Sequence, residues 1–143
     1  MTIRISTALR NALGDAITTL ADAGTAAAHL KIYSGTKPAT KGTAPSGDVL
    51  ADFVMADPIA DSSASGIWTA SAVSSVTAGN TGVPTFAVLE DSDGTYIADF
   101  DARLSTATNN GEEVVVTISG GGTSIAAGAT VSLSSATLTM PNA

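Results

Sequence analysis

Cysteine is absent from the 143 residues, and charged side chains are scarce. Without cysteine the chain can form no disulfide, thiolate zinc site, iron–sulfur cluster or thiol nucleophile. Asp, Glu, Lys and Arg make up 13% of the sequence, about half of the roughly 25% that is usual in globular domains. Thirteen acidic and six basic residues give a net charge of −7, which argues against non-specific binding to phosphate backbones.

Long apolar runs and aromatic side chains are also lacking. The N-terminal segment is interrupted by Arg10, Asp15 and Asp22, so it offers neither the apolar region of a signal peptide nor an 18-residue membrane span. We therefore expect a soluble protein that stays in the cytoplasm unless it is assembled into something larger. Six aromatic residues are too few for a sugar-stacking platform or a nucleic-acid surface, and their positions in expected strands favour a core role.

Small residues dominate what is present. The 26 Ala, 20 Thr and 16 Ser together account for 62 of 143 residues. Few Lys and Glu side chains mean that little side-chain entropy is lost when a surface is buried against a neighbour. The cores of protein interfaces are likewise depleted in Lys and Glu. This composition is typical of a structural building block rather than of a solvated enzyme.

Residues 1–24 carry the clearest helical pattern. Ser6 or Thr7 is a suitable N-cap, and Gly24 a suitable left-handed terminator. Gly14 should lower helix stability by about 0.5–1 kcal/mol relative to Ala unless something packs closely there. The apolar stripe, which we expect to be buried against a sheet or another subunit, consists of Leu9, Leu13, Ala16, Ile17 and Leu20.

After this helix the apolar residues recur at every second position, which predicts a β domain over residues 25–143. Asp91-Ser92-Asp93-Gly94 predicts a hairpin turn, and the change of phase at Ser134-Ser135 predicts a β-bulge or a bend between sheets. The fold class we expect is mainly β, an antiparallel β-sandwich of the jelly-roll or Ig-like type with one N-terminal amphipathic helix. Its expected strands cover residues 30–33, 49–55, 67–76, 84–90, 95–101, 112–118 and 131–140.

No catalytic or metal-binding constellation stands out. His29 is the only histidine, and a strand-edge role explains it better than a catalytic or ligand role. Asp91-Ser92-Asp93-Gly94 imitates the start of a calcium loop, but Ala102 occupies the position where an EF-hand has a carboxylate. The glycine run 120–122 lacks the lysine of a phosphate-binding loop. We expect a protein that is not an enzyme and has no cofactor and no metal.

Four stretches of the chain are informative together: Met1–Arg4, Leu30–Pro38, Leu89–Gly94 and Ile125–Val131. They resemble small structural proteins of tailed bacteriophages and prophages, and Leu30–Pro38 is the most specific of them. The resemblance extends over most of the chain in order. It implies a virion component without catalytic residues, made in the cytoplasm of the host bacterium.

Within that family we expect a decoration or cement protein on the outer capsid surface. Its partners would be the major capsid protein and copies of itself, with a trimer as one suitable arrangement, and no nucleic acid and no membrane. The alternatives are a tail, collar or head–tail joining protein, and a carbohydrate-binding attachment module that would need exposed aromatics such as Trp68. The residues expected to form the interface, with the lysines facing an acidic capsid lattice, are Ile3, Arg4, Leu9, Leu13, Ile17, Leu20, Lys31, Lys37 and Lys41.

Overall fold

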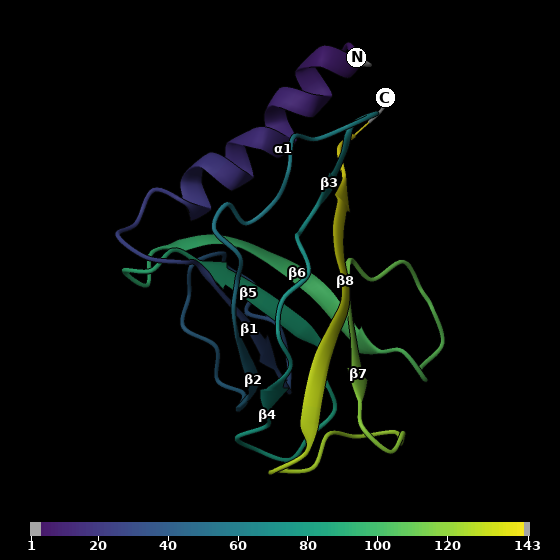
Figure 1. Ribbon diagram of the computed structural model, residues 1–143. Coiled ribbons are helices and arrows are strands. Elements are labelled where there is room, and N and C mark those ends of the chain that lie inside the picture. Colours follow the sequence, from purple (N-terminus) through teal and green to yellow (C-terminus); the bar gives the residue numbers. More distant parts are fainter. Residues whose placement is uncertain (1–3, 142–143) are drawn as a thin grey trace.

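The computed structural model describes residues 4–141, and within them one helix precedes eight strands (Figure 1). The helix lies across one end of the sheet, beside the C-terminal half of the last strand (Figure 1). In chain order the elements are α1 (Thr7–Ala21), β1 (His29–Tyr33), β2 (Val49–Val54), β3 (Ile67–Thr69), β4 (Val76–Thr77), β5 (Phe86–Glu90), β6 (Tyr96–Leu104), β7 (Val114–Ile118) and β8 (Thr130–Thr139).

The capping residues of α1 agree with the sequence prediction at the N-terminus of the helix and differ from it at the C-terminus. Ser6 adopts extended backbone, and its hydroxyl accepts a hydrogen bond from the first turn, which confirms it as the N-cap. The helix ends at Ala21 with Asp22 as its C-cap, so the prediction of Gly24 as a left-handed terminator is wrong. Gly24 instead allows close contact with the hairpin turn, because a Cβ there would lie 2.1 Å from Ser92 Oγ.

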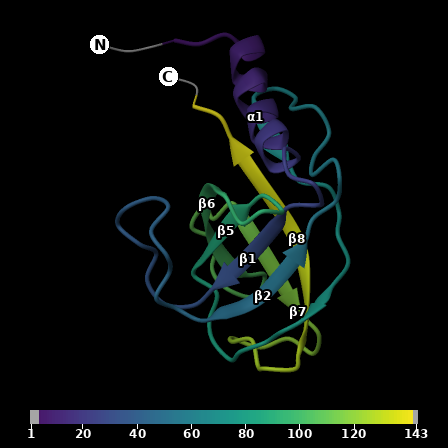
Figure 2. The same ribbon diagram turned by 90° about the vertical axis from the view of Figure 1, so that its left-hand side faces the viewer.

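The strands form a single mixed sheet that curls into a half-barrel (Figures 1 and 2). The order is β2-β1-β5-β6-β7-β8-β3, and β4 pairs with the other part of β8. A wholly antiparallel sheet was the wrong expectation, because β6 and β7 run parallel with Ala102 opposite Val114. Residues 105–113 return the chain along β6 before β7 begins. The curl brings the two sides of the sheet together after β4, where Gly79 N donates to Leu50 O at 3.0 Å.

The expected hairpin is confirmed between β5 and β6. Asp91 stabilises its turn by accepting hydrogen bonds from Thr95 N at 2.8 Å and Asp93 N at 2.9 Å. The bond from Thr95 is the main reason why the pKa of this carboxyl lies below its usual value. The acidic motif is therefore the tip of a hairpin flanked by strands.

The expected bulge is confirmed in β8. Leu133 pairs with Val116 and Ser135 with Val115, which leaves Ser134 as the extra residue. The bulge separates two halves of a long strand that pair with different neighbours: the first with β4 and the second with β3. The phase change of the sequence therefore marks the point beyond which β8 exchanges β4 for β3 as its second neighbour and continues toward the helix (Figure 1).

The core lies inside the curl of the sheet and includes Trp68, its largest side chain. Trp68 is 1% exposed, and its ring stacks on Phe100 at a centroid distance of 6.3 Å. The single strand expected over 67–76 is two short strands instead, β3 and β4. Between them the backbone follows other partners, since Ala70 N donates to Ala136 O and Ser71 N donates to Ile59 O.

Candidate functional site

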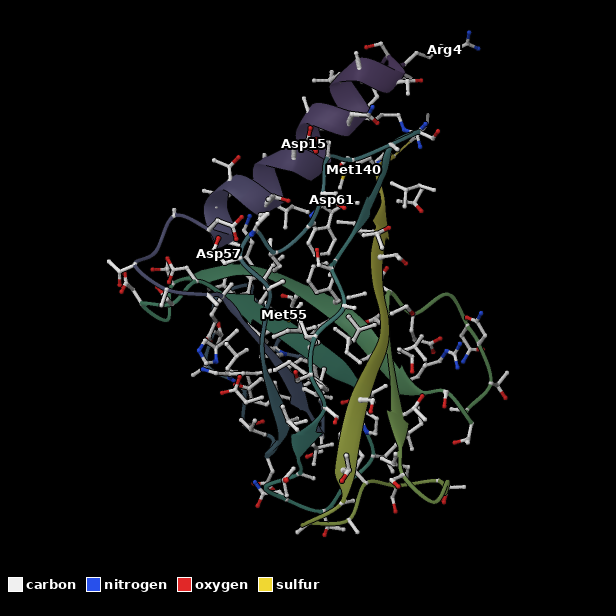
Figure 3. All side chains as sticks on the ribbon, viewed as in Figure 1. Arg4, Asp15, Met55, Asp57, Asp61 and Met140 are labelled. Carbon is white, nitrogen blue, oxygen red and sulfur yellow. The ribbon has the colours of Figure 1, made fainter. Side chains whose placement is uncertain are left out.

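Polar side chains fasten α1 to the rest of the fold. Three of them accept hydrogen bonds from backbone amides of the irregular segment 59–66, which lies alongside the helix (Figure 3). Because this segment lies outside the named strands, the helix side chains satisfy amides that a sheet would otherwise pair. The pairs are Ile59 N with Asp22 Oδ1 (3.1 Å), Ser63 N with Asp15 Oδ1 (2.6 Å) and Gly66 N with Asn11 Oδ1 (2.7 Å).

Two further contacts join the helix to the long strand and to the core. The guanidinium of Arg10 donates from Nε and Nη2 to Met140 O, at 3.2 and 3.1 Å. The indole Nε1 of Trp68 donates to Thr18 Oγ1 at 3.0 Å. Arg10 and Asp15 are the only charged residues of α1, and both face the barrel.

Gly14 lies at the closest approach between the helix and segment 59–66. A Cβ at this position would lie 2.2 Å from Ser63 Oγ and 3.2 Å from Trp68 Cβ. The glycine therefore has the close-packing role that its place within a helix suggested. No larger residue lets the helix backbone come this near to Ser63.

The opposite face of α1 is apolar, uncharged and open to solvent. Leu9, Leu13 and Leu20 are 47%, 45% and 56% exposed, and Ala16 completes the row. We call these four residues the outward face. Ile17, which the sequence placed in the same stripe, turns inward and packs against the core. This row of exposed apolar side chains on one helix face is a candidate interaction surface.

The lysines expected at the interface are largely matched by carboxylates of the same chain. Lys31 Nζ lies 2.5 Å from Glu90 Oε2, and Lys37 Nζ lies 2.7 Å from Asp101 Oδ1 and 3.4 Å from Asp99 Oδ1. Hydrogen bonds to Glu90 and Asp101, respectively, are the main reason why the pKa values of Lys31 and Lys37 are raised. Both ammonium groups therefore already have acidic partners within the same chain.

The expected interface residues fall in two separate places. Arg4 is exposed and projects beyond the start of α1, at the end of the row of leucines (Figure 3). Lys41 is exposed on the loop between β1 and β2. Figure 2 shows this loop extending away from the helix. Ile3 lies outside the described residues. The structure therefore places Arg4 just before the helix that carries the leucines, and the lysines on β1 and the β1–β2 loop.

Residues with catalytic or ligand potential are dispersed. His29 Nδ1 lies 2.8 Å from Asp52 Oδ1 across the β1–β2 pair, and both side chains are partly exposed. Within residues 4–141, no group of three His, Asp or Glu side chains is placed to hold a metal ion. No helix in this part of the chain has the length and apolar character needed to cross a membrane.

We compared the chain with known proteins by family, sequence and structure. No protein-family model, curated protein or solved structure matches the chain. The candidate site therefore depends on its geometry: an apolar, uncharged outward face on a helix whose polar side chains hold it to the barrel.

Proposed function

We propose that the protein is a structural component of a bacteriophage virion, a decoration or cement protein that binds the outer surface of the capsid. The single observation that carries the proposal is the outward face of α1, where three leucines are about half exposed on a helix whose charged side chains face the barrel. The resemblance of the sequence to small phage structural proteins supports it, as does the low charge content.

The outward face fits an apolar strip that crosses the boundary between two major capsid subunits. Burial of apolar surface would provide the affinity, because roughly 25 cal/mol is gained for each Å² removed from water. One helix face is smaller than a standard interface of about 1,200–2,000 Å², so the neighbouring Arg4 and further copies of the chain would contribute the rest.

Stabilisation of the shell follows from mass action. A protein that binds the assembled lattice but not the free subunits stabilises the lattice by RT ln(1 + [L]/Kd) at each site. Repetition over many equivalent sites makes even a modest affinity effective. The helix is well suited to this role because its position does not depend on the partner: its polar side chains already hold it to residues 59–66.

We also propose that the curled sheet functions as a two-layer sandwich. One layer would contain β2, β1, β5 and β6, and the other β7, β8, β3 and β4. The stacked rings of Trp68 and Phe100, with the buried Phe53, support this description because they fill the space between the layers. A rigid two-layer body would present the helix at a fixed angle.

Charge substitutions on the outward face test the proposal. Leu13→Glu places a carboxylate where the partner is expected, and Val54→Glu is a matched control on β2, because Val54 is 58% exposed and lies on another element. In co-sedimentation with expanded capsid shells, Leu13→Glu should abolish binding and Val54→Glu should bind like the wild type. Equal binding by the two variants would contradict an interface on α1.

Cryo-electron microscopy of virions distinguishes a capsid decoration protein from a protein of the neck or tail. Density repeated over the capsid faces, with α1 at the contact, is the expected result. Density restricted to the neck or tail would favour a tail, collar or head–tail joining protein, for which the outward face would instead join copies into a ring. Trp68 cannot serve an attachment module as a sugar-stacking platform, because it is 1% exposed.

A further inference from the structure

A second apolar cluster lies on the outer face of the sheet, separate from the core. It is formed by Tyr33, Phe86 and Val88, with Val49 and Tyr96 packed against it. The rings of Tyr33 and Phe86 stack at a centroid distance of 5.1 Å and an interplanar angle of 5°. An outer sheet face that meets water usually carries polar side chains. Tyr33, Phe86 and Val88 are only 7%, 0% and 5% exposed, so this apolar cluster is already covered.

Loop 34–48, which connects β1 and β2, contributes to that cover. Its base is closed by hydrogen bonds from Ser34 N to Asp48 O (3.1 Å) and from Asp48 N to Ser34 Oγ (3.3 Å). Lys37 then ties the loop to β6 through Asp101. The loop is thus held over the sheet at both its base and its first half.

Between this loop and the sheet lies an open cavity of about 460 Å³. That volume is within the roughly 300–1,000 Å³ typical of small-ligand sites. Both tyrosines of the protein line it, so every tyrosine signal of the chain reports on this cavity. The residues on which the argument depends are Tyr33, Val88, Tyr96, Glu90 and Asp99.

The charges around the cavity restrict its ligand. Glu90 is paired with Lys31, while Asp99 lies 3.4 Å from Lys37 and accepts a 2.7 Å hydrogen bond from the Tyr96 hydroxyl. A cationic ligand would compete with ammonium groups that are already in place. An anionic ligand would face the two carboxylates directly. The cavity therefore favours a ligand that is neutral but rich in hydrogen-bond donors.

We propose that this cavity binds a neutral saccharide. A sugar presents an apolar C–H face that packs on the partly exposed ring of Tyr96 and hydroxyl groups that donate to carboxylates, and the cavity offers both on adjoining walls. Tyr33, which is 7% exposed, reports on the same cavity from beneath. The site is independent of the outward face of α1. A decoration protein with such a site would hold glycans of the host surface while its helix stays on the capsid.

Fluorine NMR tests the site without assignment of the whole spectrum. Protein labelled with 3-fluorotyrosine gives two signals, from Tyr33 and Tyr96, and 5-fluorotryptophan gives one from the buried Trp68. The probes are neutral di- and trisaccharides of glucose, galactose, mannose and N-acetylglucosamine. At least one should shift both tyrosine signals saturably and leave the tryptophan signal in place. If none does so at millimolar concentration, the proposal is wrong.

Charged probes and one matched pair of variants test the ligand class and the location. Choline and glucose 6-phosphate should shift the tyrosine signals less than the best neutral saccharide; a stronger effect of either would overturn the neutral-ligand assignment.

Asp99→Asn should weaken saccharide binding roughly tenfold, because a charge-assisted hydrogen bond is lost. Asp52→Asn alters a carboxylate of β2 outside the cavity and should bind like the wild type. Equal affinities of the two variants would place the sugar elsewhere. None of these results alters the test of α1 on capsid shells.

Discussion

The indole Nε1 of Trp68 donates a 3.0 Å hydrogen bond to Oγ1 of Thr18, so the largest side chain of the core is joined to the helix that lies outside it. The position of α1 is therefore coupled to the packing of the barrel. The same bond gives the one tryptophan of the chain, and hence its fluorescence, direct sensitivity to the docking of the helix.

Substitution of Thr18 by Val should destabilise the protein. The isosteric change keeps the volume but leaves the buried indole N–H without its acceptor, which costs about 1–3 kcal/mol of unfolding free energy. Thr19→Val is the matched control, because Thr19 is exposed and bonds only within the helix, to Asp15 O. Urea unfolding followed by Trp68 fluorescence measures both. Equal losses in the two variants would mean that the Thr18 bond contributes nothing to the docking of the helix.

Gly14→Ala should also destabilise, although alanine is the better helix former. At an open helix position the change would add about 0.5–1 kcal/mol of stability. Here the new Cβ would meet Ser63 Cβ at 3.0 Å and Trp68 Cβ at 3.2 Å, so the helix must move outward. Overpacking of this kind costs about 1–3 kcal/mol. Calorimetric or urea unfolding gives the sign directly.

The partner variant Ser63→Ala identifies the contact responsible. Ser63 Oγ is buried and has no hydrogen-bond partner within residues 4–141, so its removal alone should leave stability unchanged or slightly raised. Combined with Gly14→Ala it should recover part of the loss, because the 2.2 Å clash with Oγ disappears while the contact with Cβ remains. Strictly additive effects of the two substitutions would contradict the close approach.

The helix shows how far the sequence could lead. Its position, its N-cap and its apolar period were predictable because they depend on local spacing. Which face turns inward was not. The polar residues Asn11, Asp15, Thr18 and Asp22 recur with the same period as the leucines, so the sequence contains two stripes. The choice between them is made by the unpaired amides of segment 59–66, which only the tertiary fold brings to the helix.

The strands show the same division between local and distant causes. The hairpin at Asp91–Gly94 is predictable from its turn residues, and the bulge at Ser134 from the change of phase in the alternation of apolar residues. The parallel pairing of β6 with β7 depends on the path of residues 105–113, for which no local pattern exists. The cavity beside Tyr33 and Tyr96 was likewise missed, since aromatics in strands were assigned to the core.

Truncation of an outward leucine should cost far less than truncation of a core leucine. Leu13 is 45% exposed and Leu30 is 2% exposed, although both are regularly spaced apolar residues in the sequence. Leu30→Ala should lower the unfolding free energy by about 2–5 kcal/mol. Leu13→Ala should stay within roughly 0.5 kcal/mol of the wild type, as is usual for surface positions. Comparable losses in dilute solution would show that α1 turns its leucines toward the barrel.

Alkaline titration should distinguish Tyr96 from an ordinary tyrosine. Burial, and then the hydrogen bond to Asp99, raise the pKa of Tyr96 to about 12. The folded state therefore keeps a proton that the unfolded state loses near its ordinary value of 10.0. The associated stability is complete below that value and is lost as the pH rises toward 12. Fluorine NMR of 3-fluorotyrosine protein, whose ring fluorine lowers both reference pKa values alike, resolves the two titrations.

Asp99→Asn supplies the control for this assignment. It should lower the Tyr96 pKa toward its ordinary value, because the carboxylate no longer opposes ionisation of the hydroxyl. Tyr33, whose pKa is raised mainly by burial, should titrate as before. A change confined to Tyr33 would contradict the observed bond between Tyr96 and Asp99.

Hydrogen exchange should show that helix side chains protect backbone amides outside the strands. The amides of Ile59, Ser63 and Gly66 donate to Asp22, Asp15 and Asn11, so they should exchange slowly despite their irregular segment. Asp15→Ala should speed exchange at Ser63 most, because its acceptor at 2.6 Å is removed while Asn11 and Asp22 still hold the flanking amides.

Two loop amides that are paired with backbone carbonyls provide the internal reference for the hydrogen-exchange experiment. Gly82 N and Ile125 N each donate to the carbonyl of the other, at 2.9 and 2.8 Å, in the loops that follow β4 and β7. Their exchange should be the same in the wild type and in Asp15→Ala. Faster exchange at both places would indicate global destabilisation. A change limited to Ser63 would show that single side chains of α1 hold the segment locally, which is what keeps the outward face in place without a partner.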